Sequence, residues 1–323
     1  MVTRRTIQTA VGYFVALLLL ALGAVWASRN WDSLVRAASL DWRLLLPLLP
    51  LVVVANIFTG LINQVMATHL GAPLPLREVI PLGLASTAAN YFLPMRAGAG
   101  LRAAYFKKRC NLPLTAFAGS MAAVYVITLL VNATLGLGGM ALVYANQQVW
   151  STSVAVVFAS VVAICLAALL VRLPAIGKDS PNRILVKLWR VHTGWETLRR
   201  SPGVLARSAG LSVLLTSTLM VRLFLIYLAL GQPVSWAGCM LIAAMTAVST
   251  FVSITPAGLG VREAMILFAS IAIGVTPEVS LVAATIDRVA AVVVLAIAGP
   301  ISMVYLSRRV NADLRHPDAL SDS

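Results

Sequence analysis

Ala-Gly-Ala-Gly-Leu-Arg occupies residues 97–102, and the similar phrase Ala-Gly-Leu-Gly-Val-Arg occupies residues 257–262. The two phrases begin 160 positions apart in a chain of 323 residues, so they stand at matching places in its two halves. Each follows an apolar run and a proline (Pro94 or Pro256). Glycine and proline let a chain reverse direction. Between two apolar runs, such a phrase predicts broken backbone close to or inside a membrane.

The composition indicates a membrane protein. Hydrophobic residues make up 60% of the chain and charged residues 11%, whereas soluble domains carry about 25% charged residues. Mean hydropathy is +0.90. Six apolar runs approach or exceed the ~20 residues that a helix needs to cross a bilayer: 9–27, 44–66, 114–144, 151–171, 208–230 and 281–306. We therefore predict an all-α polytopic membrane protein with about six spanning helices in a single integral-membrane domain, 1–323. The first run resembles a signal peptide, but its length favours an uncleaved helix.

The net charge of +14 comes from basic residues in loops beside apolar runs. This placement follows the positive-inside rule and favours anionic lipid surfaces as partners over nucleic acid. The three cysteines and three histidines are scattered, so we expect neither disulfides nor a metal site, and no cofactor. The basic segment 172–207 contains apolar residues at helical spacing: Ile184, Leu188, Val191, Trp195 and Leu198. It predicts a cytoplasmic amphipathic helix on the membrane surface, with a plain linker as the alternative.

The loop charges predict the topology. Segment 172–207 and the Arg308-Arg309 end should be cytoplasmic, as should the N-terminus, and the uncharged turns 145–150 and 231–236 should be external. Segment 79–112 then begins and ends inside, which predicts a re-entrant hairpin. Segment 237–274 begins and ends outside, as two spans or as a second hairpin, and its short second arm favours the hairpin.

These assignments make the halves 9–144 and 151–306 an inverted repeat joined through the amphipathic segment. Inverted repeats with broken helices near the midplane are typical of transporters. The predicted hairpin turns contain Pro94, Gly98, Gly100, Pro256, Gly258 and Gly260. The alternative is that both phrases are ordinary interfacial turns with snorkelling arginines.

Ionisable residues in apolar surroundings are costly, so they usually have a partner or a function. Five basic residues fall within the predicted membrane region: Arg96, Arg102, Arg222, Arg262 and Arg288. Glu263 and Asp287 are the acidic residues there. The basic excess favours an anionic ligand, and arginine suits phosphate because its planar fork bonds two oxygens. The two acids either neutralise arginines or couple transport to protons.

The segments Pro94-Met95-Arg96-Ala97-Gly98-Ala99-Gly100-Leu101-Arg102 and Pro256-Ala257-Gly258-Leu259-Gly260-Val261-Arg262-Glu263 resemble paired motifs of the lysylphosphatidylglycerol synthase transmembrane region, or flippase-like domain family. The resemblance implies a bacterial or archaeal plasma-membrane protein that moves a phospholipid or polyprenyl-linked lipid between leaflets. Many members carry an acid where this chain has Ala99, and the soluble aminoacyl-transferring domain is missing, so lysyl transfer is not implied.

The first functional hypothesis is therefore a lipid flippase or scramblase with an arginine-lined cavity for an anionic headgroup. A membrane-embedded lipid-modifying transferase is the alternative, but no catalytic constellation is visible, so we expect no enzymatic activity. A third hypothesis is a non-transporting partner of a lipid-synthesis enzyme. Homo-oligomerisation is also open.

Overall fold

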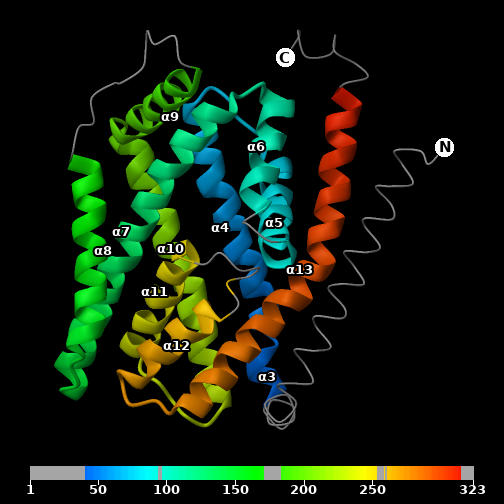
Figure 1. Ribbon diagram of the computed structural model, residues 1–323. Coiled ribbons are helices and arrows are strands. Elements are labelled where there is room, and N and C mark those ends of the chain that lie inside the picture. The colour runs from blue at the N-terminus through cyan, green and yellow to red at the C-terminus, as the bar shows by residue number, and fades with distance from the viewer. Residues whose placement is uncertain (1–40, 94–96, 171–182, 253–257, 259, 314–323) are drawn as a thin grey trace. The chain divides into compact units, whose positions relative to one another are not determined.

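The computed structural model describes residues 41–93, 97–170, 183–252, 258 and 260–313. These residues form helices and no strand. The helices are α3 (Trp42–Leu45), α4 (Leu48–His69), α5 (Leu76–Phe92), α6 (Ala97–Cys110), α7 (Leu114–Gln147), α8 (Thr152–Leu170), α9 (Arg183–Arg199), α10 (Pro202–Ala229), α11 (Trp236–Val252), α12 (Val261–Ile271) and α13 (Pro277–Asp313). All packing discussed below lies within the compact unit Arg43–Ser323 (Figure 1).

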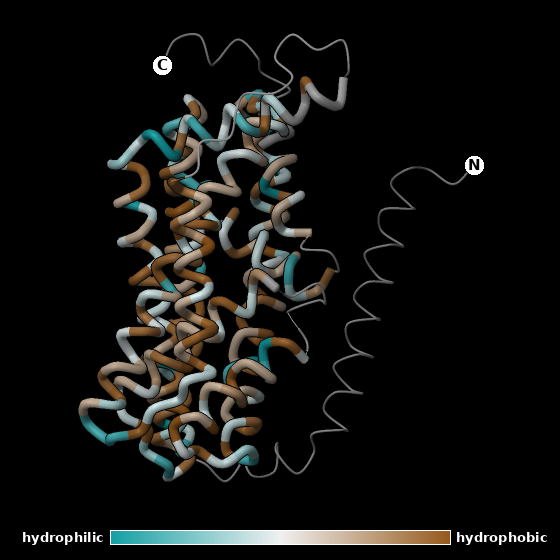
Figure 2. Tube along the Cα trace, turned by 60° about the vertical axis from the view of Figure 1, so that its left-hand side comes forward, coloured by the Kyte–Doolittle hydropathy of each residue, from teal (hydrophilic) through white to brown (hydrophobic). Residues whose placement is uncertain are grey.

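Five segments are long and apolar enough to cross a membrane, judged by length and composition within the described residues. They are Trp42–His69, Leu114–Gln147, Thr152–Leu170, Pro202–Ala229 and Pro277–Arg309. Figure 2 shows hydrophobic residues along much of the length of the chain's helices. The predicted all-α membrane fold is confirmed, and these five segments match five of the six predicted spans. The first predicted span, 9–27, lies outside the described residues.

The helix boundaries repeat along the chain. The short helix α5 begins at Leu76 and ends at Phe92, and α11 begins at Trp236 and ends at Val252, each 160 positions later. In both halves a long helix is followed by two short helices and a second long helix. The packing repeats as well, because α5 packs on α13 while α11 packs on α7, and α4 packs on α10. The same order of helices therefore occurs twice, with the first short helix of each half packed on the last long helix of the other.

The two breaks between short helices differ in their glycines. Leu93 has extended backbone at the end of α5, as expected for a residue before proline. Gly98 and Gly100 lie in the first turn of α6, so their prediction as turn residues is wrong. Gly258 and Gly260 have φ values of +67° and +84°, a conformation that favours glycine, and they lie just before α12. Pro94 and Pro256 lie outside the described residues.

Glycines allow the helices α4 and α5 to pack closely together. A Cβ atom added to Gly60 of α4 would lie 2.6 Å from the carbonyl oxygen of Val79 in α5. One added to Gly83 of α5 would lie 2.4 Å from the carbonyl oxygen of Asn56 in α4. Close backbone approach of this kind is the usual basis of helix association in lipid. It brings α4 and α5 together around the cavity described below.

The predicted amphipathic helix is present as α9, but part of its apolar face packs against protein. Leu198 is fully buried, and Trp195 packs against the same buried cluster as Phe117 of α7. A Cβ atom on Gly119 of α7 would lie 2.0 Å from the carbonyl oxygen of Val191. The C-terminal half of this face is therefore covered by protein and is not free to lie in lipid as predicted.

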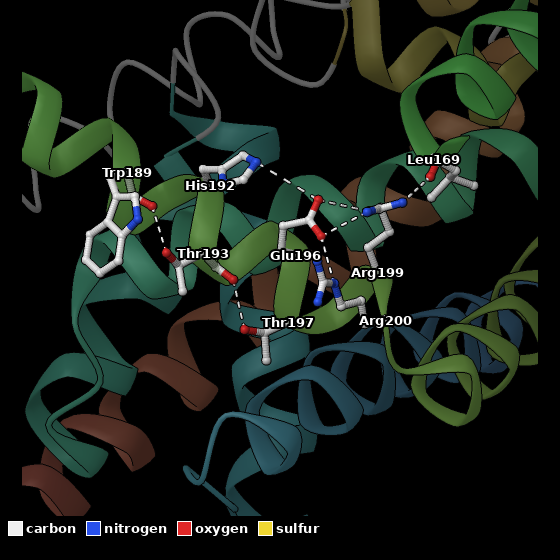
Figure 3. A network of polar contacts seen from close by, with 8 residues as sticks. All are labelled: Leu169, Trp189, His192, Thr193, Glu196, Thr197, Arg199 and Arg200. Atoms are coloured by element: carbon white, nitrogen blue, oxygen red, sulfur yellow. Dashed lines mark hydrogen bonds and ion pairs between the residues drawn. The ribbon is translucent and has the colours of Figure 1, made fainter. Parts of the chain in front are cut away.

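A polar network ties the end of α9 to α8 (Figure 3). The guanidinium of Arg199 donates to both carboxylate oxygens of Glu196, at 3.1 and 2.9 Å, and to the carbonyl oxygen of Leu169 at 2.7 Å. Arg200 donates to the same carboxylate at 3.1 Å. Glu196 thus holds Arg199 in the orientation that bridges to the last turn of α8.

Glu196→Gln is expected to remove an acid-dependent part of the protein's stability. The hydrogen bonds from Arg199 hold the pKa of Glu196 below its usual value of 4.5. When the pKa of a carboxyl group is lower in the folded protein than in the unfolded chain, its contribution to stability is complete at pH values above the unfolded pKa. This contribution is lost as the pH falls through the folded pKa. Melting temperatures in detergent between about pH 3 and pH 7 should therefore fall less steeply at the acid end for the variant than for the wild type. Identical profiles would contradict this assignment.

Candidate functional site

A cavity of about 360 Å³ lies among the helices, and both repeated phrases line it. The first phrase contributes Ala99 and Arg102 from α6, and the second contributes Gly258 and Arg262 at the start of α12. The other lining residues come from α4, α5, α7, α10, α11 and α13 and are a mixture of apolar, hydroxyl, amide and arginine side chains. Two segments far apart in the sequence therefore meet at one site.

Arg102 is the cavity arginine with neutral partners. It is buried, with 6% of its surface exposed. Its guanidinium donates to Asn63 Oδ1 at 2.8 Å and to the hydroxyl of Tyr125 at 3.2 Å. Its Nε has no hydrogen-bond partner among the described residues, and none of those residues forms an ion pair with it. Arg102 therefore brings a positive charge to the cavity that no described acid neutralises.

Asp287 of α13 joins the other two cavity arginines. One carboxylate oxygen accepts from Arg222 of α10 and the other from Arg262 of α12. Asp287 is fully buried and lies behind the lining, whereas both arginines reach the cavity. Arg262 also donates to the hydroxyl of Tyr91 at 2.7 Å. One carboxylate between two guanidinium groups leaves this trio with a charge of +1.

Glu263 and Arg288 form a second ion pair next to this trio. The other oxygen of Glu263 accepts from the backbone N–H of Gly260 at 2.9 Å, which holds the acid at the start of α12. Neither residue lines the cavity. The structure thus brings Arg102, Arg222 and Arg262 to one cavity and places Arg288 in a neutral pair beside it. Arg96 lies outside the described residues.

Several polar residues of the site were missed by the sequence interpretation. Asn63, Tyr91 and Tyr125 each bond to a cavity arginine from another helix. No sequence signal distinguishes them, because each lies between 23 and 171 residues from the arginine that it contacts. A second polar group, where the start of α5 meets the end of α6, was also missed. Fully buried Glu78 accepts from the hydroxyl of Tyr105 at 2.7 Å and from Arg109 Nε at 3.1 Å.

A signal for the Glu78 group does exist in the sequence. Glu78 stands in the first turn of a helix that follows Pro75, where a negative charge is favoured by the helix dipole. An acid at the start of an apolar helix also requires a cation when it is buried. Arg109, 31 residues later, meets that requirement at the C-terminal end of the paired helix. This contact fixes α6 against α5 and thereby helps to orient Arg102.

Comparison with known proteins gives one family. No curated protein matches the chain in sequence. Residues 9–299 match the lysylphosphatidylglycerol synthase TM region. The matched stretch is most of the chain and contains both repeated phrases, every residue of the site and the five described spans, except the last ten residues of Pro277–Arg309. The chain therefore belongs to the lysylphosphatidylglycerol synthase transmembrane-region family.

Proposed function

We propose that the protein is a lipid transporter, a flippase or scramblase, that moves an anionic phospholipid or a polyprenyl-linked lipid between leaflets. The observation that carries the proposal is the convergence of both repeated phrases and three arginines on one cavity. Arg102 and the Asp287 trio together give the cavity a charge of about +2 by formal count of the described groups. A buried excess of positive charge requires an anion, and arginines recognise phosphate oxygens through paired hydrogen bonds.

The cavity suits a headgroup better than a whole lipid. Its volume of about 360 Å³ is at the small end of the usual range for ligand pockets, about 300–1,000 Å³. Apolar residues share the lining with the polar ones. In the proposed mechanism the phosphate crosses the membrane beside the arginines, which replace its water shell, while the acyl or prenyl chains stay in lipid. The proposed mechanism contains no covalent step, so we propose transport without enzymatic activity or cofactor.

The repeated helices support an inverted arrangement in the membrane. The α5–α6 pair lies toward one end of the described bundle and the α11–α12 pair toward the other (Figure 1). In our proposal these pairs are re-entrant hairpins that enter from opposite faces of the plasma membrane, with both chain termini cytoplasmic. The cavity at their tips would then open alternately toward either leaflet, as in transporters with inverted repeats.

Asp287 and Glu263 act in this proposal as counter-ions. Both oxygens of Asp287 already accept from arginines, and both oxygens of Glu263 are likewise bonded. This arrangement supports a role in holding Arg222 and Arg262 in place and argues against a role in proton coupling.

Arg102→Gln is expected to slow lipid movement about ten- to a hundredfold, because hydrogen bonds to a charged group contribute about 1.5–3 kcal/mol. The measurement is the movement of fluorescent anionic phospholipids or polyprenyl phosphates across liposomes that contain the purified protein. Lys108→Gln is the matched control, since Lys108 lies on the same helix and is exposed. Wild-type protein that moves none of these lipids would refute the transport proposal, and a wild-type rate in Arg102→Gln would remove that residue from the site.

A further inference from the structure

A second cavity, of about 480 Å³, lies between the end of α4 and the start of α10. Its described lining residues are Gln64, Val65, Thr68 and His69 of α4 and Val204 and Arg207 of α10. No described residue lines both this cavity and the central one. The second cavity therefore needs an explanation of its own.

The polar groups of the second cavity favour an anion. Arg207 is exposed and forms no hydrogen bond or ion pair with any described residue. The exposed hydroxyl of Thr68 likewise has no hydrogen-bond partner among these residues. None of the described lining residues is acidic. Val204 belongs to the first turn of α10, which is the positive end of that helix dipole. The cavity thus combines positive charge with unused hydrogen-bond donors.

The end of α4 is poorly suited to a cation. Free carbonyl groups at the C-terminus of a helix attract cations. In α4, however, the carbonyl oxygens of Met66, Ala67 and Thr68 already accept from the N–H groups of residues 70–72. The helix end therefore contributes side-chain donors to the cavity, while most of its terminal carbonyl groups are engaged.

His69 joins the two sides of the second cavity. Ser201, in the turn between α9 and α10, donates its hydroxyl proton to the carbonyl oxygen of Thr197 at 2.8 Å. A hydroxyl group has one proton, so in the 2.8 Å contact between Ser201 Oγ and His69 Nε2 the histidine donates. This bond links the last residue of α4 to the residue that precedes α10. The walls of the cavity are therefore held together by the protein itself.

The place of the second cavity along the spans favours a lipid as the source of the anion. His69 is the last residue of the candidate span Trp42–His69, and Arg207 lies in the second turn of Pro202–Ala229. The ends of spanning helices lie close to the lipid headgroups. Apolar Val65 and Val204 share the lining with the polar residues. A phosphate bound here can therefore remain attached to acyl chains that lie along the apolar helices.

We propose that the second cavity binds the phosphate of an anionic phospholipid as a structural ligand, separate from any lipid that the protein transports. The phosphate accepts hydrogen bonds from the guanidinium of Arg207 on α10 and from the hydroxyl of Thr68 on α4, and so links the two helices. Arginine suits this task because its planar fork bonds two phosphate oxygens. The inference goes beyond the proposed function and does not depend on it, since the two cavities share no described lining residue.

Thermal denaturation of the purified protein in a neutral detergent tests the proposal with phosphatidylglycerol, zwitterionic phosphatidylcholine and inorganic phosphate. Phosphatidylglycerol in about tenfold excess over its dissociation constant should raise the melting temperature by about 2–4 °C, because a ligand that binds only the folded state stabilises it. Phosphatidylcholine should have a smaller effect, since its ammonium group is repelled by Arg207. Equal shifts from the two lipids would overturn the proposal. An equal shift from inorganic phosphate at the same concentration would assign the site to the free anion and overturn the lipid as its ligand.

Variants of the two helices locate the site. Arg207→Gln should lower the apparent affinity for phosphatidylglycerol about tenfold or more, and Thr68→Val about two- to tenfold, as expected for the loss of a charged and of a neutral hydrogen bond. Arg207→Lys should retain part of the affinity, because lysine keeps the charge without the planar fork. Arg308→Gln is the matched control, since it removes the same charge from an exposed arginine on α13. A wild-type response in Arg207→Gln would refute this site.

The Arg102→Gln variant separates the second cavity from the central one, where the proposed function also places an anionic lipid. In an Arg102→Gln background, adding Arg207→Gln should still remove most of the remaining shift caused by phosphatidylglycerol. A shift that disappears in Arg102→Gln alone would place the stabilising lipid in the central cavity and overturn the inference. Protein that shows the Arg207-dependent shift but moves no lipid across liposomes would support the second site and refute the transport function.

Discussion

Asp287→Asn is expected to lower the free energy of unfolding by about 3–5 kcal/mol, which is the usual cost of removing one partner from a buried ion pair. The carboxylate is fully buried and accepts from two arginines on two other helices. Without its charge, Arg222 and Arg262 would face each other with no anion between them. Asparagine keeps the size of the side chain but has a single acceptor oxygen, so one of the two arginines would also face an N–H donor in place of an acceptor.

Unfolding in detergent, measured by thermal denaturation and by titration with a denaturing detergent, checks this expectation. Glu278→Gln is the matched control, because Glu278 is an exposed acid on the same helix. The double variant Arg222→Gln with Asp287→Asn restores the original net charge of the trio, and should be less destabilised than the sum of the two single variants. Additive losses would show that the contact of Asp287 with Arg222 contributes little to stability.

The long helices were predictable because a bilayer imposes strict limits on sequence. A spanning helix needs about 20 apolar residues, and its backbone must satisfy its own hydrogen bonds. The runs 114–144, 208–230 and 281–306 therefore correspond to the helices α7, α10 and α13, whose boundaries differ from those of the runs by up to seven residues. The repeated phrase also located the cavity, since both copies line it.

The side-chain partners of the site were not predictable in the same way. Asn63 and Arg102 are 39 residues apart, and Arg262 and Tyr91 are 171 residues apart. Such contacts depend on the angles and positions at which the helices pack against one another, and the hydropathy pattern does not predict these. The charge count had left two roles open for Asp287 and Glu263, neutralising arginines or coupling transport to protons, and it had no basis for choosing which arginines they would contact. Arg102 has only neutral partners, Asn63 and Tyr125, whereas Arg262 is paired with an acid. The repeated phrases, which are similar, do not predict this difference.

The glycines of the first phrase show why composition alone misleads. Gly98 and Gly100 were predicted as turn residues, yet both lie in the first turn of α6, and they have different surroundings there. A Cβ atom on Gly98 would lie 1.9 Å from the carbonyl oxygen of Ser86 and 2.7 Å from Asn90 Oδ1, both on α5. A Cβ atom on Gly100 would have no heavy atom within 4 Å. Gly98 therefore allows α6 to pack closely against α5, whereas no described residue approaches Gly100 closely enough to require a glycine there.

Gly98→Ala and Gly100→Ala are therefore expected to have opposite effects on stability. Alanine is favoured over glycine in a helix by about 0.5–1 kcal/mol, so Gly100→Ala should raise the melting temperature slightly. Gly98→Ala receives the same helical gain, but α6 must move away from α5 to admit the methyl group, and overpacking of this kind costs about 1–3 kcal/mol. The move also breaks the 2.9 Å hydrogen bond from Gly98 N–H to Asn90 Oδ1.

The same displacement should reach the cavity, because Arg102 lies one turn farther along α6 than Gly98. Gly98→Ala is thus expected to lower both the melting temperature in detergent and the affinity of the central cavity for phosphatidylglycerol, whereas Gly100→Ala should leave the affinity unchanged. The comparison separates packing from helix propensity, since both variants add one methyl group to the same helical turn. Equal stabilities would mean that α5 and α6 are not in close contact at Gly98. A destabilised Gly98→Ala that binds lipid normally would mean that the position of α6 does not control Arg102.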